Sequence, residues 1–323
     1  MLHHISKRTF FLIAAGSIIF NILALVFIFA KEPEIPNKAQ NLRSRFVFLS
    51  PRVFVENPND RLVNFVPLRK TLTEYHKKTQ NHLGIYFEYL PSGVSIGLND
   101  RENFVSASLL KTPLVMGVYK QIELGKINKN DILTIRKEYL DSAFGDLWKK
   151  GEGAQLSVFE TIKIALIESD NTAKNLLFAS VPEGTLEDVF DSLDIPKELE
   201  SDQAVVTPKN YSSILRSLYL ASYLSEENSN EILNILTQTP FNDKLAAGVP
   251  DDIKVAHKFG VHLGSDDANA VFTDCGIVYA PKRPYILCIM TKTNETMAIK
   301  EMKEISKIVY DYISQANYAK SNK

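Results

Sequence analysis

The segment "NFVSASLLKTPLVMGVYKQ", residues 103–121, begins like a buried apolar element but carries Ser108 and Lys111 where Leu or Ala would pack better. If a helix begins just before Ser108, the two side chains lie three positions apart on one helical face, and the hydroxyl has a base beside it. If Thr112 instead caps a helix that starts at Pro113, both side chains lie in a loop and share no role. The stretch alone leaves both interpretations open, because Ser-x-x-Lys often arises by chance.

The composition excludes several classes of protein. The chain has 323 residues, enough for one large domain or two small ones, and a net charge of −1. Without a basic excess to neutralise phosphates, we expect no nucleic-acid partner. The six histidines do not cluster, and the two cysteines do not have zinc spacing, so we expect no metal ion and no cofactor. Gly-x-Ser-x-Gly and His-Glu-x-x-His motifs are also missing from the sequence.

The N-terminal part of the chain contains an apolar run. Residues 9–30, "TFFLIAAGSIIFNILALVFIFA", number 22 and carry no formal charge. At ~1.5 Å per residue, a helix of this length crosses a hydrocarbon layer of ~30 Å. The run exceeds the ~7 to 15 residues usual for the core of a cleaved signal peptide, so we interpret it as an uncleaved transmembrane anchor. Basic residues flank it on both sides, but a short basic tail usually stays inside. We expect residues 1–8 in the cytoplasm and the following domain on the exported side of the cell membrane.

A globular pattern begins at residue 61, after a stalk. Residues 31–60 contain four prolines among mixed charges, which is typical of a linker. An amphipathic helix is then predicted around residues 68–78, and "LGIYFEYL" and "GVSIGLN" are predicted to form a strand hairpin.

Helices dominate the middle of the chain, and strands return near its end. Ser157 and Glu160 form a capping box for one helix, and Thr207 with Pro208 opens another that runs through Leu220. Three strands are predicted after residue 250, in "IKVAHKFGVHL", "ANAVFTDCGIVYA" and "RPYILCIMTKT", and a closing helix follows them. His257 and His262 are interpreted as strand residues.

Three polar clusters lie at the ends of predicted elements: Ser108-Leu109-Leu110-Lys111, Ser169-Asp170-Asn171 and Lys258-Phe259-Gly260. Each has a simple explanation alone, such as a helix end or a charge on an edge strand. In this order they resemble the Ser-x-x-Lys, Ser-Asp-Asn and Lys-Thr-Gly signature of class A β-lactamases and penicillin-binding D,D-peptidases, the penicillin-recognising serine enzymes. The resemblance extends over about residues 80–315.

The resemblance implies the fold and its division into parts. The fold class is α/β (α+β), with a largely antiparallel sheet that is built from both ends of the chain and flanked by helices. An all-helical region of about residues 106–250 is inserted, and the site lies where this region meets the sheet. Residues 61–323 would then form the catalytic domain.

The resemblance also implies a role for each residue of the three clusters. Ser108 would be the nucleophile and Lys111 its base, Ser169 would relay a proton to the leaving nitrogen, and Lys258 would supply positive potential. The substrate would contact Asn171, Phe259, Gly260 and Val261. The backbone N–H groups of Ser108 and Val261 would hold the oxyanion. The substrates implied are peptidoglycan stem peptides ending in D-Ala-D-Ala, or β-lactams.

Two features depart from the family pattern. Phe259 stands where Thr or Ser usually donates a hydroxyl to the substrate carboxylate. The segment between Asn171 and Thr207 is shortened and has no Glu-x-x-Leu-Asn, whose Glu activates the water that releases the acyl-enzyme. The acids present there are most simply solvated charges, although one of them could substitute: Glu198, Glu200 and Asp202. We therefore expect slow release of β-lactams, with an efficient β-lactamase and an inactive binding or sensor protein as alternatives.

The two cysteines lie on neighbouring predicted strands. If the turn between these strands pairs Tyr279 with Pro284, Cys275 lies opposite Cys288, within reach of a disulfide. The sequence leaves open whether the two are bonded, and the frequent burial of free cysteine slightly favours two thiols on a core face.

Overall fold

The computed structural model describes residues 47–48, 64–79, 81–200, 203–264 and 270–315, all within the unit Phe46–Lys323. Residues 9–30, interpreted as a transmembrane anchor, and most of the interpreted stalk lie outside the described residues. Among the residues that are described, no helix combines the length and the apolar character needed to span a membrane.

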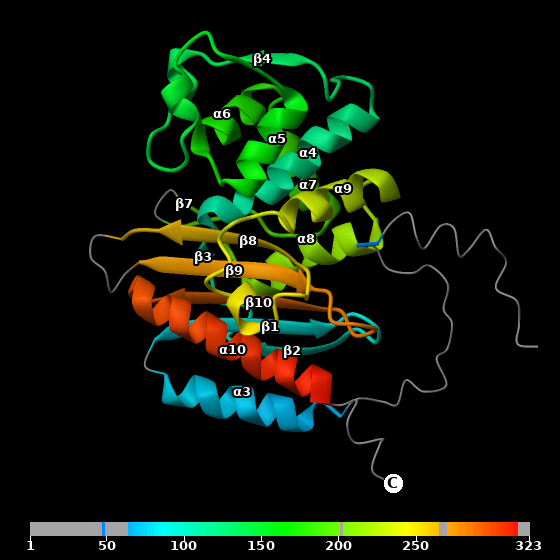
Figure 1. The fold of residues 1–323 in the computed structure, drawn as a ribbon, viewed down its shortest axis with the longest axis vertical. Helices are drawn as coiled ribbons and strands as arrows, with labels where there is room; N and C mark the ends of the chain where they lie inside the picture. The colour runs from blue at the N-terminus through cyan, green and yellow to red at the C-terminus, as the bar shows by residue number, and fades with distance from the viewer. Residues whose placement is uncertain (1–46, 49–63, 80, 201–202, 265–269, 316–323) are drawn as a thin grey trace, which may run out of the picture. The chain divides into compact units, whose positions relative to one another are not determined.

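A five-stranded sheet joins the two ends of the described chain (Figure 1). Its order is β2-β1-β10-β9-β8, and all neighbouring strands are antiparallel. The strands are β1 (His82–Tyr89), β2 (Val94–Leu98), β8 (Val255–His262), β9 (Val271–Val278) and β10 (Tyr285–Lys292). The N-terminal hairpin therefore pairs with the C-terminal strands, as predicted. Strand β8 lies at one edge of the sheet, so its outer side is available to the site.

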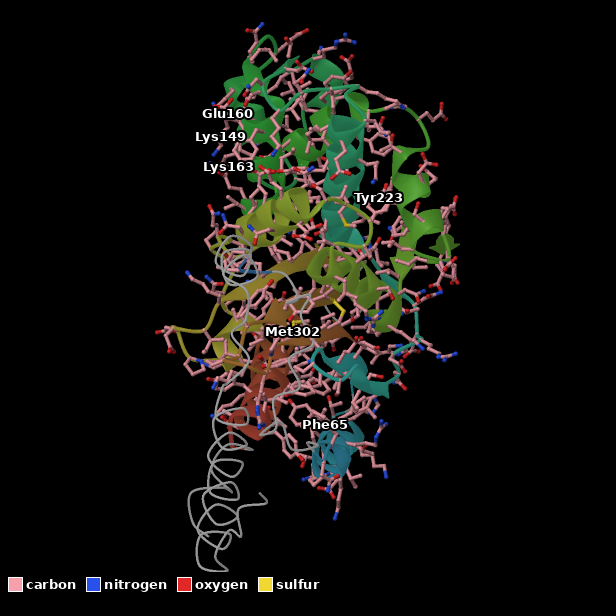
Figure 2. The ribbon with its side chains drawn as sticks, turned by 90° about the vertical axis from the view of Figure 1, so that its right-hand side faces the viewer. Phe65, Lys149, Glu160, Lys163, Tyr223 and Met302 are labelled. Carbon is pink, nitrogen blue, oxygen red and sulfur yellow. A yellow bond between two sulfur atoms is a disulfide. The ribbon has the colours of Figure 1, made fainter. Side chains whose placement is uncertain are left out.

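Two helices cover one face of the sheet, α3 (Val66–Lys78) and α10 (Glu295–Gln315) (Figure 1). Phe65, just before α3, and Met302 of α10 are both buried in this layer (Figure 2). Alternate residues of β1, including Ile85 and Phe87, pack against them because successive side chains of a strand point to opposite faces. The helix predicted around residues 68–78 is confirmed.

The other face of the sheet carries the inserted region. Its helices on this face are η1 (Ala107–Leu110), α4 (Lys111–Glu123), η2 (Lys137–Tyr139), η3 (Leu147–Lys150), α5 (Val158–Ile167), α6 (Asn171–Ala179), α7 (Thr185–Ser192), α8 (Pro208–Leu220) and α9 (Glu226–Leu236). The last turn of the region, η4 (Ala246–Gly248), packs instead against α10. The region is not helical throughout. Short strands pair within it or at its boundary: β3 (Phe104–Val105), β4 (Ile132–Thr134), β5 (Gln155–Ser157), β6 (Glu198–Glu200) and β7 (Gln203–Val206).

Helix caps fix the predicted starts of two of these helices. The hydroxyl of Thr207 accepts a hydrogen bond of 3.1 Å from the Asn210 N–H at the start of α8, and α8 ends at Leu220 as predicted. At α5, the Glu160 N–H donates to the Ser157 hydroxyl at 3.2 Å, and the Glu160 carboxylate accepts from the Ser157 N–H at 2.9 Å. Figure 2 shows Glu160 in the helical region, away from α3 and α10. Local sequence therefore determines where these helices begin.

Cys275 and Cys288 form a disulfide between β9 and β10. The two residues are direct partners in the strand register, their Cα atoms are 3.9 Å apart, and both are fully buried. The predicted pairing is confirmed, and the preference for two free thiols is wrong. The register of the hairpin places the two cysteines directly opposite each other. The preference for free thiols was based on how often cysteine is buried, which takes no account of this register.

Candidate functional site

Ser108 and Lys111 lie on one helical stretch. Ser108 belongs to the 3-10 turn η1, and Lys111 is the first residue of α4, which continues directly from it. Lys111 Nζ lies 2.9 Å from Ser108 Oγ. Thr112 is the second residue of α4, not its cap, so the interpretation that places Ser108 in a loop is wrong. The three-residue spacing brings the amine to the hydroxyl because both project from the same side of the helical stretch.

The backbone is strained at two positions of the site. Ala107, which precedes Ser108, has φ of +45°, and Ser169 has φ of +58°. Residues with a Cβ rarely adopt this region, and each costs on the order of 1–3 kcal/mol. Ser106 helps to hold the first turn, because its N–H and its hydroxyl both donate to the carbonyl oxygen of Ala204, at 2.9 and 2.7 Å. One strained residue therefore directly precedes the first cluster, and the other belongs to the second cluster.

Lys111 is buried among oxygen atoms. It is 1% exposed, and its Nζ donates to Asn171 Oδ1 at 2.8 Å and to the carbonyl oxygen of Ser169. Burial, together with the smaller effect of the positive charge of Lys174, lowers the pKa of Lys111 to about 7. A neutral amine has a free lone pair, so Lys111 can accept the proton of the Ser108 hydroxyl near neutral pH.

The second cluster forms the junction between α5 and α6. Asp170 is fully buried and accepts hydrogen bonds of 2.8 Å from the N–H groups of Ala173 and Leu147. Gly145 makes room for this carboxylate, because a Cβ at Gly145 would lie 2.1 Å from an Asp170 oxygen. Asp170 thus caps α6 and fixes the loop beside it. Asp170 was identified in the sequence as part of the second cluster, but its role as a helix cap was not predicted.

The third cluster brings a second lysine to Ser169. Lys258 is 1% exposed, and its Nζ donates to Ser169 Oγ at 2.8 Å and to the Phe259 carbonyl oxygen at 2.9 Å. Burial lowers the pKa of Lys258 well below its usual value, and the charge of Lys111 acts in the same direction. The hydroxyl of Ser169 therefore lies between two buried lysines.

Gly260 permits the close approach of β8 to η1. A Cβ at Gly260 would lie 2.7 Å from Thr273 Oγ1 and 3.2 Å from the backbone nitrogen of Ser108. Because Gly260 has no side chain, β8 can lie close to η1, and the residue after Gly260, Val261, lies close to it as well. Gly260 is thus a packing residue of the site, and Val261 lines the cleft.

A cleft of about 1000 Å³ opens beside these residues. Its walls come from η1, the loop before α6, the segment after α9, β8, β9 and the start of α10. They include Ser108, Phe144, Asn171, Phe241, Asp243, Lys244, Phe259, Val261, His262 and Glu295. His262 therefore lies at the cleft. His257 does not, because it is fully buried and its Nδ1 is 2.9 Å from Asp274 Oδ1.

Three aromatic rings meet at one wall of the cleft, and we call Phe144, Phe241 and Phe259 the phenylalanine cluster. The ring centroid of Phe259 lies 4.3 Å from that of Phe241 and 5.7 Å from that of Phe144. Lys244 adjoins the cluster, with Nζ 5.4 Å from the Phe259 ring centroid. Sequence reasoning identified Phe259 but missed the other three residues. They lie in loops, where no periodic pattern or motif marks them.

Residues 67–313 match the model of Beta-lactamase2, described as the Beta-lactamase enzyme family. The chain belongs to this family. As a Beta-lactamase2 protein it is a serine hydrolase of the β-lactamase and penicillin-binding type, which agrees with the resemblance found in the three clusters. No group of three or more His, Cys, Asp or Glu residues that could hold a metal ion occurs within the described part of the chain.

Relatives of this Beta-lactamase2 protein include β-lactamases of other bacteria. The extended-spectrum β-lactamase PER-1 of Pseudomonas aeruginosa is 25% identical over 214 residues, 60% of this chain and 70% of PER-1. An imipenem-hydrolyzing β-lactamase of Enterobacter cloacae is 26% identical over 249 residues, 71% and 84% of the two chains.

Solved structures share the fold. The structure of PBP-A superposes with a TM-score of 0.70 at 22% identity, over 77% of this chain and 97% of PBP-A. A β-lactamase from Chitinophaga pinensis also gives 0.70, at 23% identity, over 76% and 98% of the two chains. Both kinds of protein therefore have the fold of this chain.

Proposed function

We propose that this protein is a membrane-anchored serine hydrolase that forms an acyl-enzyme at Ser108 with D-Ala-D-Ala peptides of peptidoglycan or with β-lactams. The observation that carries the proposal is the position of Lys111. Its Nζ lies 2.9 Å from the Ser108 hydroxyl, and burial brings its pKa to about 7. A nucleophile with a base at this distance is the arrangement that acyl transfer requires. One relative by fold is a PBP-A mutant whose structure is an acyl-enzyme complex with penicillin G.

The chain's own residues supply each proton transfer of acylation. Lys111 takes the proton of the Ser108 hydroxyl while Oγ forms a bond with the carbonyl carbon of the substrate. The backbone N–H groups of Ser108 and Val261 receive the resulting oxyanion. When the carbon–nitrogen bond breaks, the Ser169 hydroxyl gives its proton to the leaving nitrogen. It regains a proton from the lysines beside it, Lys258 at 2.8 Å and Lys111 at 3.3 Å.

Release of the acyl group from β-lactams is proposed to be slow. Hydrolysis of the acyl-enzyme needs a base that activates water, and the expected Glu-x-x-Leu-Asn is missing from the segment after Asn171. Glu198 and Glu200 of that segment are exposed, and both accept hydrogen bonds from the Asn103 side chain. None of the described residues between Asn171 and Thr207 lines the cleft. These observations favour a penicillin-binding protein over an efficient β-lactamase.

The apolar run of residues 9–30 supports a single-pass anchor, with the catalytic domain on the exported side. The disulfide between Cys275 and Cys288 also favours this side, because disulfides persist in oxidising compartments outside the cytoplasm. The test is protease treatment of intact spheroplasts. A domain that is digested from the outside supports the proposal, and one that is protected until the cells are lysed contradicts it.

Labelling with a fluorescent penicillin tests the proposed activity. Wild-type protein is expected to retain the label after denaturation, and Ser108→Ala is expected to carry none, because the hydroxyl that forms the ester is absent. Equal labelling of both proteins would place the acylated group elsewhere. No labelling and no loss of free penicillin with the wild type would favour a binding or sensor protein with this fold.

A further inference from the structure

The two lysines beside the phenylalanine cluster face different parts of the site. Lys258 is 1% exposed, and its Nζ is hydrogen bonded to Ser169 Oγ and to the Phe259 carbonyl oxygen. Lys244, from the segment between α9 and η4, lines the same cleft as Ser108. A molecule in the cleft therefore meets the ammonium group of Lys244, whereas that of Lys258 points towards the Ser169 hydroxyl.

Phe259 borders both ammonium groups. Its ring centroid lies 4.4 Å from Lys258 Nζ and 5.4 Å from Lys244 Nζ, and Phe241 packs against it. A phenyl ring attracts cations to its face but donates no hydrogen bond to an anion. The third cluster thus presents an apolar ring to the cleft, in place of the hydroxyl that Thr or Ser would present. An anionic group of the substrate must find its partner elsewhere in the cleft.

Lys244 has the properties of such a partner. Its side chain is 6% exposed, and its ion partner among the described residues is the adjacent Asp243, at 2.8 Å. An ammonium group has three donors, so this contact leaves two for an incoming carboxylate. The Asp243 side chain is 51% exposed, so water can solvate its carboxylate when the ammonium turns to a ligand. Glu295, the other acid of the cleft wall, is exposed and is screened by water and salt.

We propose that Lys244 binds the carboxylate of the acyl donor, while the phenylalanine cluster contacts the apolar part of the donor next to that carboxylate. This inference rests on the proposed function and adds the substrate group that the cleft selects. It assigns recognition of the anion to Lys244 and leaves Lys258 to act on the proton relay through Ser169. The preferred donors are those with a free carboxylate, either a D-alanyl terminus or the carboxylate of a β-lactam.

The direct test compares benzylpenicillin with its neutral methyl ester in wild type, Lys244→Met and the matched control Lys254→Met. Lys254 is exposed just before β8 and does not line the cleft, so its replacement removes the same charge without touching the site. Loss of a hydrogen bond to a charged group is expected to lower the acylation rate constant by about 10- to 100-fold. We expect Lys244→Met to lose this factor in the acylation rate constant with the free acid and little with the ester. Lys254→Met should acylate like the wild type with both.

A second measurement separates this inference from the proposed chemistry. Ser108→Ala, which cannot be acylated, is titrated with N-acetyl-D-alanyl-D-alanine and with its C-terminal amide, with and without Lys244→Met. The inference predicts tighter binding of the carboxylate than of the amide, and loss of this difference with Lys244→Met. It is overturned if Lys244→Met weakens both ligands equally, if it changes neither, or if the carboxylate has no advantage. Failure of wild-type acylation together with a carboxylate preference that depends on Lys244 would reject the proposed chemistry and retain the inference.

Discussion

Lys258 Nζ donates a hydrogen bond of 2.8 Å to Ser169 Oγ, and Lys111 Nζ lies 3.3 Å from the same oxygen atom. Burial lowers the pKa values of both lysines, and the positive charge of Lys111 lowers that of Lys258 further. The Ser169 hydroxyl thus connects Lys111 with Lys258, the lysine of the third cluster. Acylation should depend on the protonation state of this pair.

The pH dependence of acylation follows from Lys111. The reactive form is the neutral amine, so the rate should rise as the pH increases through about 7 and level off above it. Lys174→Met removes a positive charge that lowers the pKa of Lys111, so this variant should show the rise at higher pH. Lys163→Met, at an exposed position of α5, is the matched control and should keep the wild-type profile. A profile that does not move in Lys174→Met would contradict this account of the base.

Removal of the base should abolish most of the reactivity. Lys111→Ala is expected to acylate about 10²- to 10⁴-fold more slowly than the wild type, because the Ser108 proton then has no acceptor. Stopped-flow mixing with a chromogenic cephalosporin measures the rate, and a thermal unfolding curve checks that the variant is folded. Acylation at the wild-type rate would assign the base to another group.

The sequence predicted the parts of this site that local patterns encode. The capped helix from Pro208 to Leu220 and the pairing of Cys275 with Cys288 follow from short-range rules of capping and strand register. The strained backbone at Ala107 and Ser169 could not be predicted, because Ala and Ser rarely adopt a positive φ and only the surrounding packing imposes it.

The close approach of β8 to η1 predicts the effect of Gly260→Ala. The added Cβ would lie 2.7 Å from Thr273 Oγ1 and 3.2 Å from the Ser108 nitrogen, so β8 must shift away from Ser108. Overpacking of this kind costs about 1–3 kcal/mol of unfolding free energy. Urea unfolding measures this cost. Acylation should slow by roughly 10-fold or more, since small displacements of reacting groups lower rates strongly. A variant as stable and as reactive as the wild type would show that no shift occurs.

The disulfide should be closed in exported protein and should stabilise the sheet. Alkylation of denatured protein without reductant is expected to modify neither Cys275 nor Cys288. The double variant Cys275→Ala/Cys288→Ala should lose about 3 kcal/mol of unfolding free energy, the magnitude for a loop of this size. Reduced wild-type protein is the control, because it lacks the disulfide bond but keeps both sulfur atoms. Alkylation of both cysteines in exported protein would show that the disulfide is not formed.

The contacts of the phenylalanine cluster and Lys244 could not be predicted from the sequence. Phe144, Phe241 and Phe259 come from three separate segments, and their contact depends on how the inserted region packs on β8. Lys244 belongs to no motif of the sequence, and the structure buries it against Phe259. Such long-range contacts carry no local signature, although they determine what a substrate meets in the cleft.

The lifetime of the penicilloyl adduct tests the central claim most directly. Intact-protein mass spectrometry follows wild type and Ser108→Ala over time after a pulse of benzylpenicillin and removal of the excess. The account predicts one adduct on the wild type, none on Ser108→Ala, and release that is slow compared with formation, because the sequence between Asn171 and Thr207 contains no Glu-x-x-Leu-Asn. An adduct that never accumulates while free penicillin is rapidly consumed would contradict slow release. A wild type that forms no adduct and consumes no penicillin would contradict acylation at Ser108.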